Sequence, residues 1–216
     1  MEGSQNIIPI FPQSIYKVIA PSSLINLIPW LDKQPKIPSD DSMGYGEKSK
    51  NTYILNEPEC KELKDFILNH SLLYSKILGI KCNEYKLTQS WISLKYPNQQ
   101  HHRHFHSNSV LSGVFYYDSS YDPNYSQIIF FNKSGNFFLP QNNSINMPQD
   151  PEIPLNPFNS GQYHHTPSPG EIILFPSFFD HAVPLNTSNR VRKSLAFNIV
   201  PKEGLGDALS LNELKF

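Results

Sequence analysis

Histidines are concentrated in one short segment, HHRHFHSNSVLSGVFYY at residues 101–117, which then becomes apolar and aromatic. His104 and His106 are two positions apart, so a strand through them would place both imidazole rings on one face, close enough to share a metal ion. An exposed loop rich in histidine and arginine would have the same composition. Taken alone, the segment is equally consistent with a metal site and with a solvated surface cluster.

A third histidine and a cation follow about 75 positions later, in GEIILFPSFFDHAVPLNTSNRVRKSLAFN. His181 comes after an apolar strand candidate and an FPS turn, although a histidine buried at a strand end for structural reasons would look the same. Arg192 and Ser194 have the same strand parity, so they share one face with Ala196 and Asn198. An arginine fork beside a hydroxyl is a receptor for a carboxylate.

The elements that must position these residues fall into two groups, and the first is helical. Apolar residues recur at helical spacing between residues 57 and 78, with Pro58 suited to a first turn and Gly79 to a stop, which predicts a helix. A shorter helix is expected at SSLINLIPWLD, residues 22–32, and a polar loop through PSDDSMGYGEKSKN, residues 38–51.

The second group consists of short strand-like runs separated by Asn, Pro, Gly and Ser, a pattern typical of a double-sheet jelly roll. The runs lie at residues 86–96, 110–117, 126–131, 136–139, 161–165, 171–175, 181–185 and 192–200. The stretch from Leu139 to Gly161 has too many turn residues for regular structure, and we expect a long loop that shapes a binding pocket.

Composition bounds the kind of protein further. At 216 residues the chain is long enough for one domain with a sizeable core and short for two. Charged residues make up only 17% of the chain and there are 19 prolines, a balance that favours a mostly β protein. The formal net charge of −1 provides no global basic field, which disfavours nucleic acid and anionic membranes as partners.

Cysteine usage and hydropathy indicate a location. The chain has two cysteines, Cys60 and Cys82, and it does not open with the pattern of a signal peptide. Its longest apolar runs are far shorter than the roughly 20 residues that cross a bilayer. We therefore expect a protein of the reducing cytoplasm without membrane contact.

The order H-x-H, a distant His and then R-x-S resembles the iron(II)- and 2-oxoglutarate-dependent oxygenases. The sequence is most similar to a family of such oxygenases known mainly from bacterial and phage genomes, and the resemblance covers roughly residues 86–200. The motifs that carry it are WISLKY, HFHSNSVLSGVFYY and FPSFFDHAVPLNTSNRVRKSLAFN.

The resemblance implies a mainly β fold, the double-stranded β-helix or cupin-like jelly roll, buttressed by one or two helices. A single oxygenase domain would then comprise a lead-in strand and helices (1–85), the jelly-roll core (86–200) and a C-terminal tail (201–216). The longer helix should cover the outside of the larger sheet, because its apolar stripe needs a partner.

The resemblance also implies a set of site residues. Iron(II) would be bound by His104, His106 and His181, and the far carboxylate of the co-substrate 2-oxoglutarate by Arg192 and Ser194. An unidentified small molecule or peptide would be hydroxylated, with release of succinate and carbon dioxide. Most enzymes of the wider superfamily have Asp or Glu where His106 stands, so a three-histidine face is implied here.

Chemistry supports this set, because three protein ligands leave three positions of an octahedral ion open, enough for a bidentate 2-oxo acid and dioxygen. Imidazole also suits other divalent ions, so the ligands do not select iron by themselves. Two other functions stay open: a three-histidine zinc enzyme or cupin-type dioxygenase that needs no 2-oxoglutarate, and a catalytically silent binding module. The first of these leaves the R-x-S pair unexplained.

Several residues are rivals or neighbours of this set. His102 with His104 forms a second H-x-H pair, and the family pattern favours His104 with His106. Arg190 is a second candidate for the carboxylate anchor, and we interpret it as a turn residue. For most of the remaining polar and aromatic residues near the motifs we expect packing or solvation instead of a catalytic role: Tyr96, Tyr116, His101, His164 and His165. Asp180 either supports a metal ligand from behind or is solvated.

Overall fold

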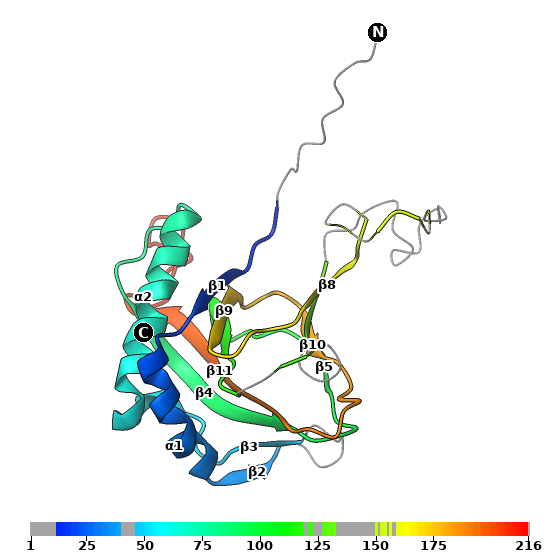
Figure 1. The fold of residues 1–216 in the computed structure, drawn as a ribbon. Helices are drawn as coiled ribbons and strands as arrows, with labels where there is room; N and C mark the ends of the chain where they lie inside the picture. Colours follow the sequence, from blue (N-terminus) through cyan, green and yellow to red (C-terminus); the bar gives the residue numbers. More distant parts are fainter. Residues whose placement is uncertain are drawn as a thin grey trace.

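The structure is a computed structural model that describes residues 12–39, 46–118, 121–122, 127–132, 150, 152–154, 156 and 159–215. Within these ranges the chain forms two antiparallel sheets, one of seven strands and one of four, packed face to face (Figure 1). The large sheet has the order β1 (Tyr16–Ile19), β9 (Glu171–Pro176), β6 (Leu111–Phe115), β11 (Arg192–Pro201), β4 (Tyr85–Lys95), β3 (Glu47–Ser49), β2 (Lys36–Pro38). The small sheet has the order β5 (His101–His104), β10 (His181–Val183), β7 (Ile128–Phe131), β8 (Gln162–His165). This is the mainly β, two-sheet architecture expected of a jelly roll.

The central strands of the large sheet are apolar on both faces because both faces are covered. On β6, Val114 packs with Phe130 and Phe175 between the two sheets, whereas Leu111 and Phe115 belong to the larger core on the other side of the sheet. The run LSGVF is therefore buried along its whole length, which explains why its sequence shows no alternation of polar and apolar residues.

Helices cover the outer face of the large sheet. In Figure 1, α1 (Ile28–Lys33) and α2 (Lys61–Ile77) lie on the opposite side of that sheet from β5, β8 and β10. Three short 3-10 helices, Ser22–Leu27, Ile54–Asn56 and Pro58–Cys60, lead into them in the described part of the chain. Both helices predicted from the sequence are confirmed.

Helix α2 follows its sequence pattern closely. Leu63, Ile67 and Tyr74 are buried at helical spacing and pack with residues of β4 and β9, which confirms that the helix buttresses the large sheet. The chain leaves the helix at Gly79, whose φ of 71° lies in the left-handed region that glycine adopts without a steric penalty.

The N-terminal segment contributes more to the sheet than the sequence predicts. The expected polar loop at residues 38–51 contains strand β3, and β2 precedes it, so that this hairpin extends one edge of the large sheet while β1 extends the other. The buried Ser49 explains part of the difference, because its hydroxyl accepts a hydrogen bond from the Ile92 N–H at 3.0 Å. A polar residue in a strand does not produce the apolar pattern by which strands are recognised.

Two predictions fall on residues that the structure does not describe. The expected strand at 136–139 and most of the expected loop at 139–161 lie outside the described residues. In the part of the chain that is described, no helix is both long and apolar enough to cross a membrane.

Candidate metal centre

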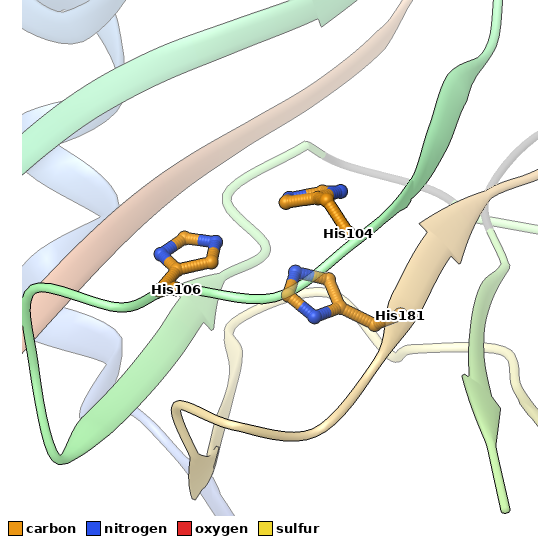
Figure 2. A group of neighbouring side chains, drawn as sticks. All are labelled: His104, His106 and His181. Atoms are coloured by element: carbon orange, nitrogen blue, oxygen red, sulfur yellow. The ribbon is translucent and has the colours of Figure 1, made fainter. Parts of the chain in front are cut away.

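Three histidine side chains meet between the sheets. His104 is the last residue of β5 and His181 the first of β10, and the two are direct partners in the antiparallel ladder. One ring nitrogen from each of His104, His106 and His181 lies within 4.8 Å of the others. Figure 2 shows the three rings turned toward one another from two neighbouring strands and the segment after β5.

The sequence predicts that His104 and His106 converge because they lie on one face of a single strand, and this reason is wrong. His104 and His106 are not carried by one strand, because β5 ends at His104. After that the chain turns toward the large sheet, where the His106 N–H donates to the Ser177 carbonyl at 2.9 Å. His106 therefore reaches the group through a loop that is hydrogen-bonded to the chain just before His181, not through strand alternation.

Each of the three imidazoles is held by an oxygen acceptor at its Nδ1. The partners are the His102 carbonyl for His104 at 2.8 Å, the Phe179 carbonyl for His181 at 2.9 Å, and the Asn198 Oδ1 for His106 at 2.6 Å. Because a carbonyl oxygen can only accept, each Nδ1 carries the hydrogen and each Nε2 keeps its lone pair. The three rings are thus in the tautomer that binds a metal through Nε2.

Burial also keeps these rings neutral. It is the main cause that lowers the pKa of all three histidines, and it lowers the pKa of His181 to about 3. Imidazole binds metal only in its neutral form. Three neutral imidazoles with oriented lone pairs form a donor set that fits a divalent transition metal such as iron(II) or zinc.

The rings of the rival pair, His102 and His104, also lie close, with centroids 5.3 Å apart, but His102 does not join the group that includes His181. His102 is exposed, and the metal-competent group found among the described residues contains His104, His106 and His181. His101 lies nearer, with its ring edge-on to His104 at a centroid distance of 4.5 Å, and it lines the pocket beside the cluster.

The predicted carboxylate anchor lines the same pocket as the histidines. Arg192 and Ser194 are each only 2% exposed, and an Arg192 Nη1–H donates to Ser194 Oγ at 3.0 Å. The guanidinium also lies over the ring of the buried Tyr116, at 5.4 Å from its centroid. Arg190, in contrast, is an exposed residue of the turn before β11.

The structure adds residues of β4 that the sequence reasoning missed. Ser93 and Lys95 face the same pocket, and Trp91 stacks on the His106 ring at a centroid distance of 6.0 Å. Burial, and after it the neighbouring Arg192, lower the pKa of Lys95 to about 7. The alternation of Trp, Ser and Lys in WISLKY could have revealed that these three side chains share a face.

Three of the neighbouring residues for which packing or solvation was expected form contacts outside the pocket. Asp180 forms an ion pair with Arg103 at 2.7 Å, and the Tyr96 hydroxyl donates to Glu47 at 2.6 Å. His165 is buried in a pair with Glu171. These contacts connect strands around the pocket and do not enter it.

Comparison with known proteins identifies the class of protein. A family model described as "Putative 2OG-Fe(II) oxygenase" matches residues 89–198, which is 110 of the 216 residues. The chain therefore belongs to this family of iron(II)- and 2-oxoglutarate-dependent oxygenases, as its motifs predict. Among curated proteins, no sequence matches it significantly.

Solved structures show the same fold at low sequence identity. A 2OG-Fe(II) oxygenase family oxidoreductase from Burkholderia pseudomallei is 12% identical, with a TM-score of 0.58 over 86% of this chain and 84% of its own. A Pseudomonas putida prolyl-4-hydroxylase is 15% identical, with a TM-score of 0.56 over 86% and 92%. HygX from Streptomyces hygroscopicus, solved with nickel, 2-oxoglutarate and hygromycin B, is 9% identical, with a TM-score of 0.57 over 88% and 83%.

Proposed function

We propose that this oxygenase hydroxylates a small molecule, with iron(II) held by His104, His106 and His181 and the distal carboxylate of 2-oxoglutarate held by Arg192 and Ser194. The observation that carries the proposal is that three neutral histidines and a buried Arg–Ser pair line one pocket. When bound there, iron(II) and 2-oxoglutarate supply the oxidation of a substrate C–H bond, coupled to the release of succinate and carbon dioxide.

The protein's own contribution is to orient the metal ligands and the group that binds the co-substrate. The three Nδ1 hydrogen bonds fix the imidazole rings before metal arrives, so that little ordering remains to be done on binding. Arg192 is held by Ser194 and Tyr116, which fixes its guanidinium at the wall of the pocket, and a guanidinium is a bidentate partner for a carboxylate.

His106 changes the charge of the centre relative to enzymes with a carboxylate at this position. Three neutral ligands leave the full charge of a divalent ion uncompensated by the protein. An anionic co-substrate is then bound more strongly at the metal than it would be beside a carboxylate ligand. We infer that the three-histidine set favours binding of the 2-oxo acid.

A small-molecule substrate is supported by the structural neighbours, of which HygX was solved with hygromycin B. A cytoplasmic location is supported by the two cysteines, Cys60 and Cys82, both of which are free thiols.

The decisive experiment compares two arginine variants in 2-oxoglutarate binding. Losing one partner of a buried charge pair typically costs about 2 to 5 kcal/mol, so Arg192→Ala should weaken 2-oxoglutarate binding about 30-fold or more at ~1.4 kcal/mol per tenfold. Arg190→Ala should change it little, because Arg190 is exposed. Calorimetry under anaerobic conditions, with manganese(II) as an inert stand-in for iron, measures both.

The same experiment can refute the proposal. Wild-type protein that binds no 2-oxoglutarate, or variants that behave alike, would exclude Arg192 as the anchor. Retention of manganese(II) by Arg192→Ala is the control that the metal centre is intact. Zinc as the metal of protein purified without chelator, together with no turnover of 2-oxoglutarate on iron reconstitution, would favour the zinc-enzyme alternative.

A further inference from the structure

Lys95 and Ser93 on β4 lie directly opposite Arg192 and Ser194 on the neighbouring strand β11. In the ladder of β4 and β11, Lys95 is the direct partner of Arg192 and Ser93 of Ser194. Direct partners in an antiparallel pair point to the same face of the sheet, with Cβ atoms roughly 5 Å apart. Each pair is closed by its own hydrogen bond, from Arg192 to Ser194 at 3.0 Å and from Lys95 Nζ to Ser93 Oγ at 3.1 Å.

Lys95 is an unusual residue to bury at this place. It is only 2% exposed, its strongest charged neighbour is the Arg192 cation, and burial and that neighbour both disfavour its charged form. None of the described residues that line the pocket is Asp or Glu. A buried ammonium is seldom retained without a partner anion, so the arrangement calls for an anion that arrives with a ligand.

We propose that Lys95 and Ser93 form the second half of the receptor for the distal carboxylate of the co-substrate, opposite Arg192 and Ser194. This inference rests on the proposed function. The receptor would then contain two cations and two hydroxyls from two adjacent strands, and each carboxylate oxygen would meet one cation. A carboxylate accepts about four hydrogen bonds, which matches four donor side chains.

The position of Lys95 favours the distal carboxylate over the end of the co-substrate that binds metal. Along β4, Trp91 is the residue that packs on His106, and Lys95 lies two inward-facing positions further on. At about 3.3 Å per residue along a strand, this separates the two positions by roughly 13 Å of backbone. Lys95 is therefore the direct neighbour of Arg192. Its charge nevertheless also helps to lower the pKa of His101 and of His104.

The test uses Lys95→Met, which keeps the length of the side chain and removes its charge, and Lys193→Met as a matched control. Lys193 is a lysine next to Arg192 on β11, but it lies on the opposite face and pairs with Asp32. Binding of 2-oxo acids to the cobalt(II)-loaded protein is followed by the visible absorption of the metal, which also reports weak binding.

We expect Lys95→Met to weaken 2-oxoglutarate binding about 10- to 30-fold, since a charge-assisted hydrogen bond is lost. Binding of 2-oxopentanoate, which has the same chain length and no distal carboxylate, should change less than 3-fold. Lys193→Met should bind both ligands like the wild type. Ser93→Ala, a smaller change in the same half of the receptor, should weaken only 2-oxoglutarate, by a few-fold.

The unfolding temperature of the ligand-free protein shows whether Lys95 serves to bind the co-substrate or to stabilise the fold. Lys95→Met should raise the unfolding temperature of the ligand-free protein, because it removes a buried cation beside Arg192. A lysine that served only to hold β4 in place would lower it. Gain of stability together with loss of 2-oxoglutarate affinity is the combination that the receptor predicts.

The outcomes distinguish this inference from the proposed function. Failure of the wild type to bind cobalt(II) or 2-oxoglutarate would refute the proposed function itself. If Arg192→Ala weakens 2-oxoglutarate binding and neither Lys95→Met nor Ser93→Ala does, the receptor contains Arg192 without its β4 half and the inference is overturned. Equal weakening of both 2-oxo acids by Lys95→Met would also overturn it, because Lys95 would then act at the metal end.

Discussion

Asn198 connects the large sheet to the histidine cluster through a single hydrogen bond. Its Oδ1 accepts from His106 Nδ1 at 2.6 Å and from the Ser112 hydroxyl at 2.9 Å. His106 lies on a loop, so Asn198 is what fixes the orientation of its ring. A side chain of β11 therefore orients the His106 ring, whereas a shared strand would orient both histidines if His104 and His106 lay on one.

Removing this acceptor should weaken metal binding without removing a ligand. We expect Asn198→Ala to lower the affinity for cobalt(II) or zinc about 10- to 100-fold, the usual effect of losing a group that orients a ligating histidine. Asn198→Asp, which keeps an acceptor oxygen, should stay close to the wild type. Asn108→Ala is the matched control, since Asn108 accepts a hydrogen bond from Asn198 Nδ2 at 3.4 Å, whereas His106 is held by Asn198 Oδ1. Competition with a chromophoric chelator measures each affinity, and a wild-type value for Asn198→Ala would contradict the orienting role.

At the scale of elements, the large sheet separates a structural face from a functional face. Odd and even positions of β11 divide accordingly: Leu195 and Phe197 pack toward α2, while Arg192, Ser194 and Asn198 face the pocket and the histidines. Changes on the helix side should therefore affect folding and leave the metal centre intact.

Helix α2 offers a direct test of this separation. Ile67 is fully buried against the sheet, and Ile67→Ala should lower the free energy of unfolding by about 2 to 4 kcal/mol through lost burial and a cavity. Leu73 on the same helix is 47% exposed, and Leu73→Ala should cost less than about 1 kcal/mol. Urea denaturation gives both values. Cobalt(II) loading of the folded variants should be unchanged, and a loss of loading in Ile67→Ala would show that the faces are coupled.

At the scale of the whole molecule, the proposed ligands bridge the two sheets. His104 and His181 belong to the small sheet, and Arg192 and Lys95 to the large one. A metal with bound 2-oxoglutarate would thus link elements that otherwise meet through the apolar cluster around Phe130. The single-domain prediction remains a proposal, supported by a core that contains residues of the lead-in and of the jelly roll.

This bridging predicts a strong effect of ligands on thermal stability. A ligand at 100 times its dissociation constant stabilises the native state by about 2.7 kcal/mol, which corresponds to roughly 5 to 10 °C for a chain of this size. We expect manganese(II) with 2-oxoglutarate to raise the melting temperature by this amount and a chelator to reverse the change. His181→Ala should abolish the metal-dependent part, and a shift that persists in this variant would place the metal elsewhere.

Gly113 is a motif residue whose need for glycine is explained only by the tertiary structure. A Cβ at this position would lie 2.4 Å from Cζ of Phe197 and 2.6 Å from the Ile173 carbonyl oxygen. Glycine in SGVFYY is therefore required by the close approach of β9 and β11 on either side of β6. Sequence reasoning could recognise the motif, but it could not supply this contact between residues far apart in the chain.

The sequence by itself determined the class of fold, the two helices, most of the strands, and the family to which the chain belongs. These features depend on short-range patterns: helical spacing in 57–78, strand alternation around Arg192 and Ser194, and the spacing of the histidine motifs. Such patterns are read from neighbours in the chain, because side-chain periodicity is a local property of the backbone.

Only the tertiary structure decided how the pocket is assembled. The pairing of His104 with His181, the support of His106 by Asn198 and the register that sets Lys95 opposite Arg192 all join segments at least 77 residues apart. Register and cross-strand contact depend on which strands become neighbours, and local periodicity carries no information about that choice. From the sequence alone, Lys95 is only a polar residue within a motif. The pairing of β4 with β11 makes it a buried cation beside Arg192.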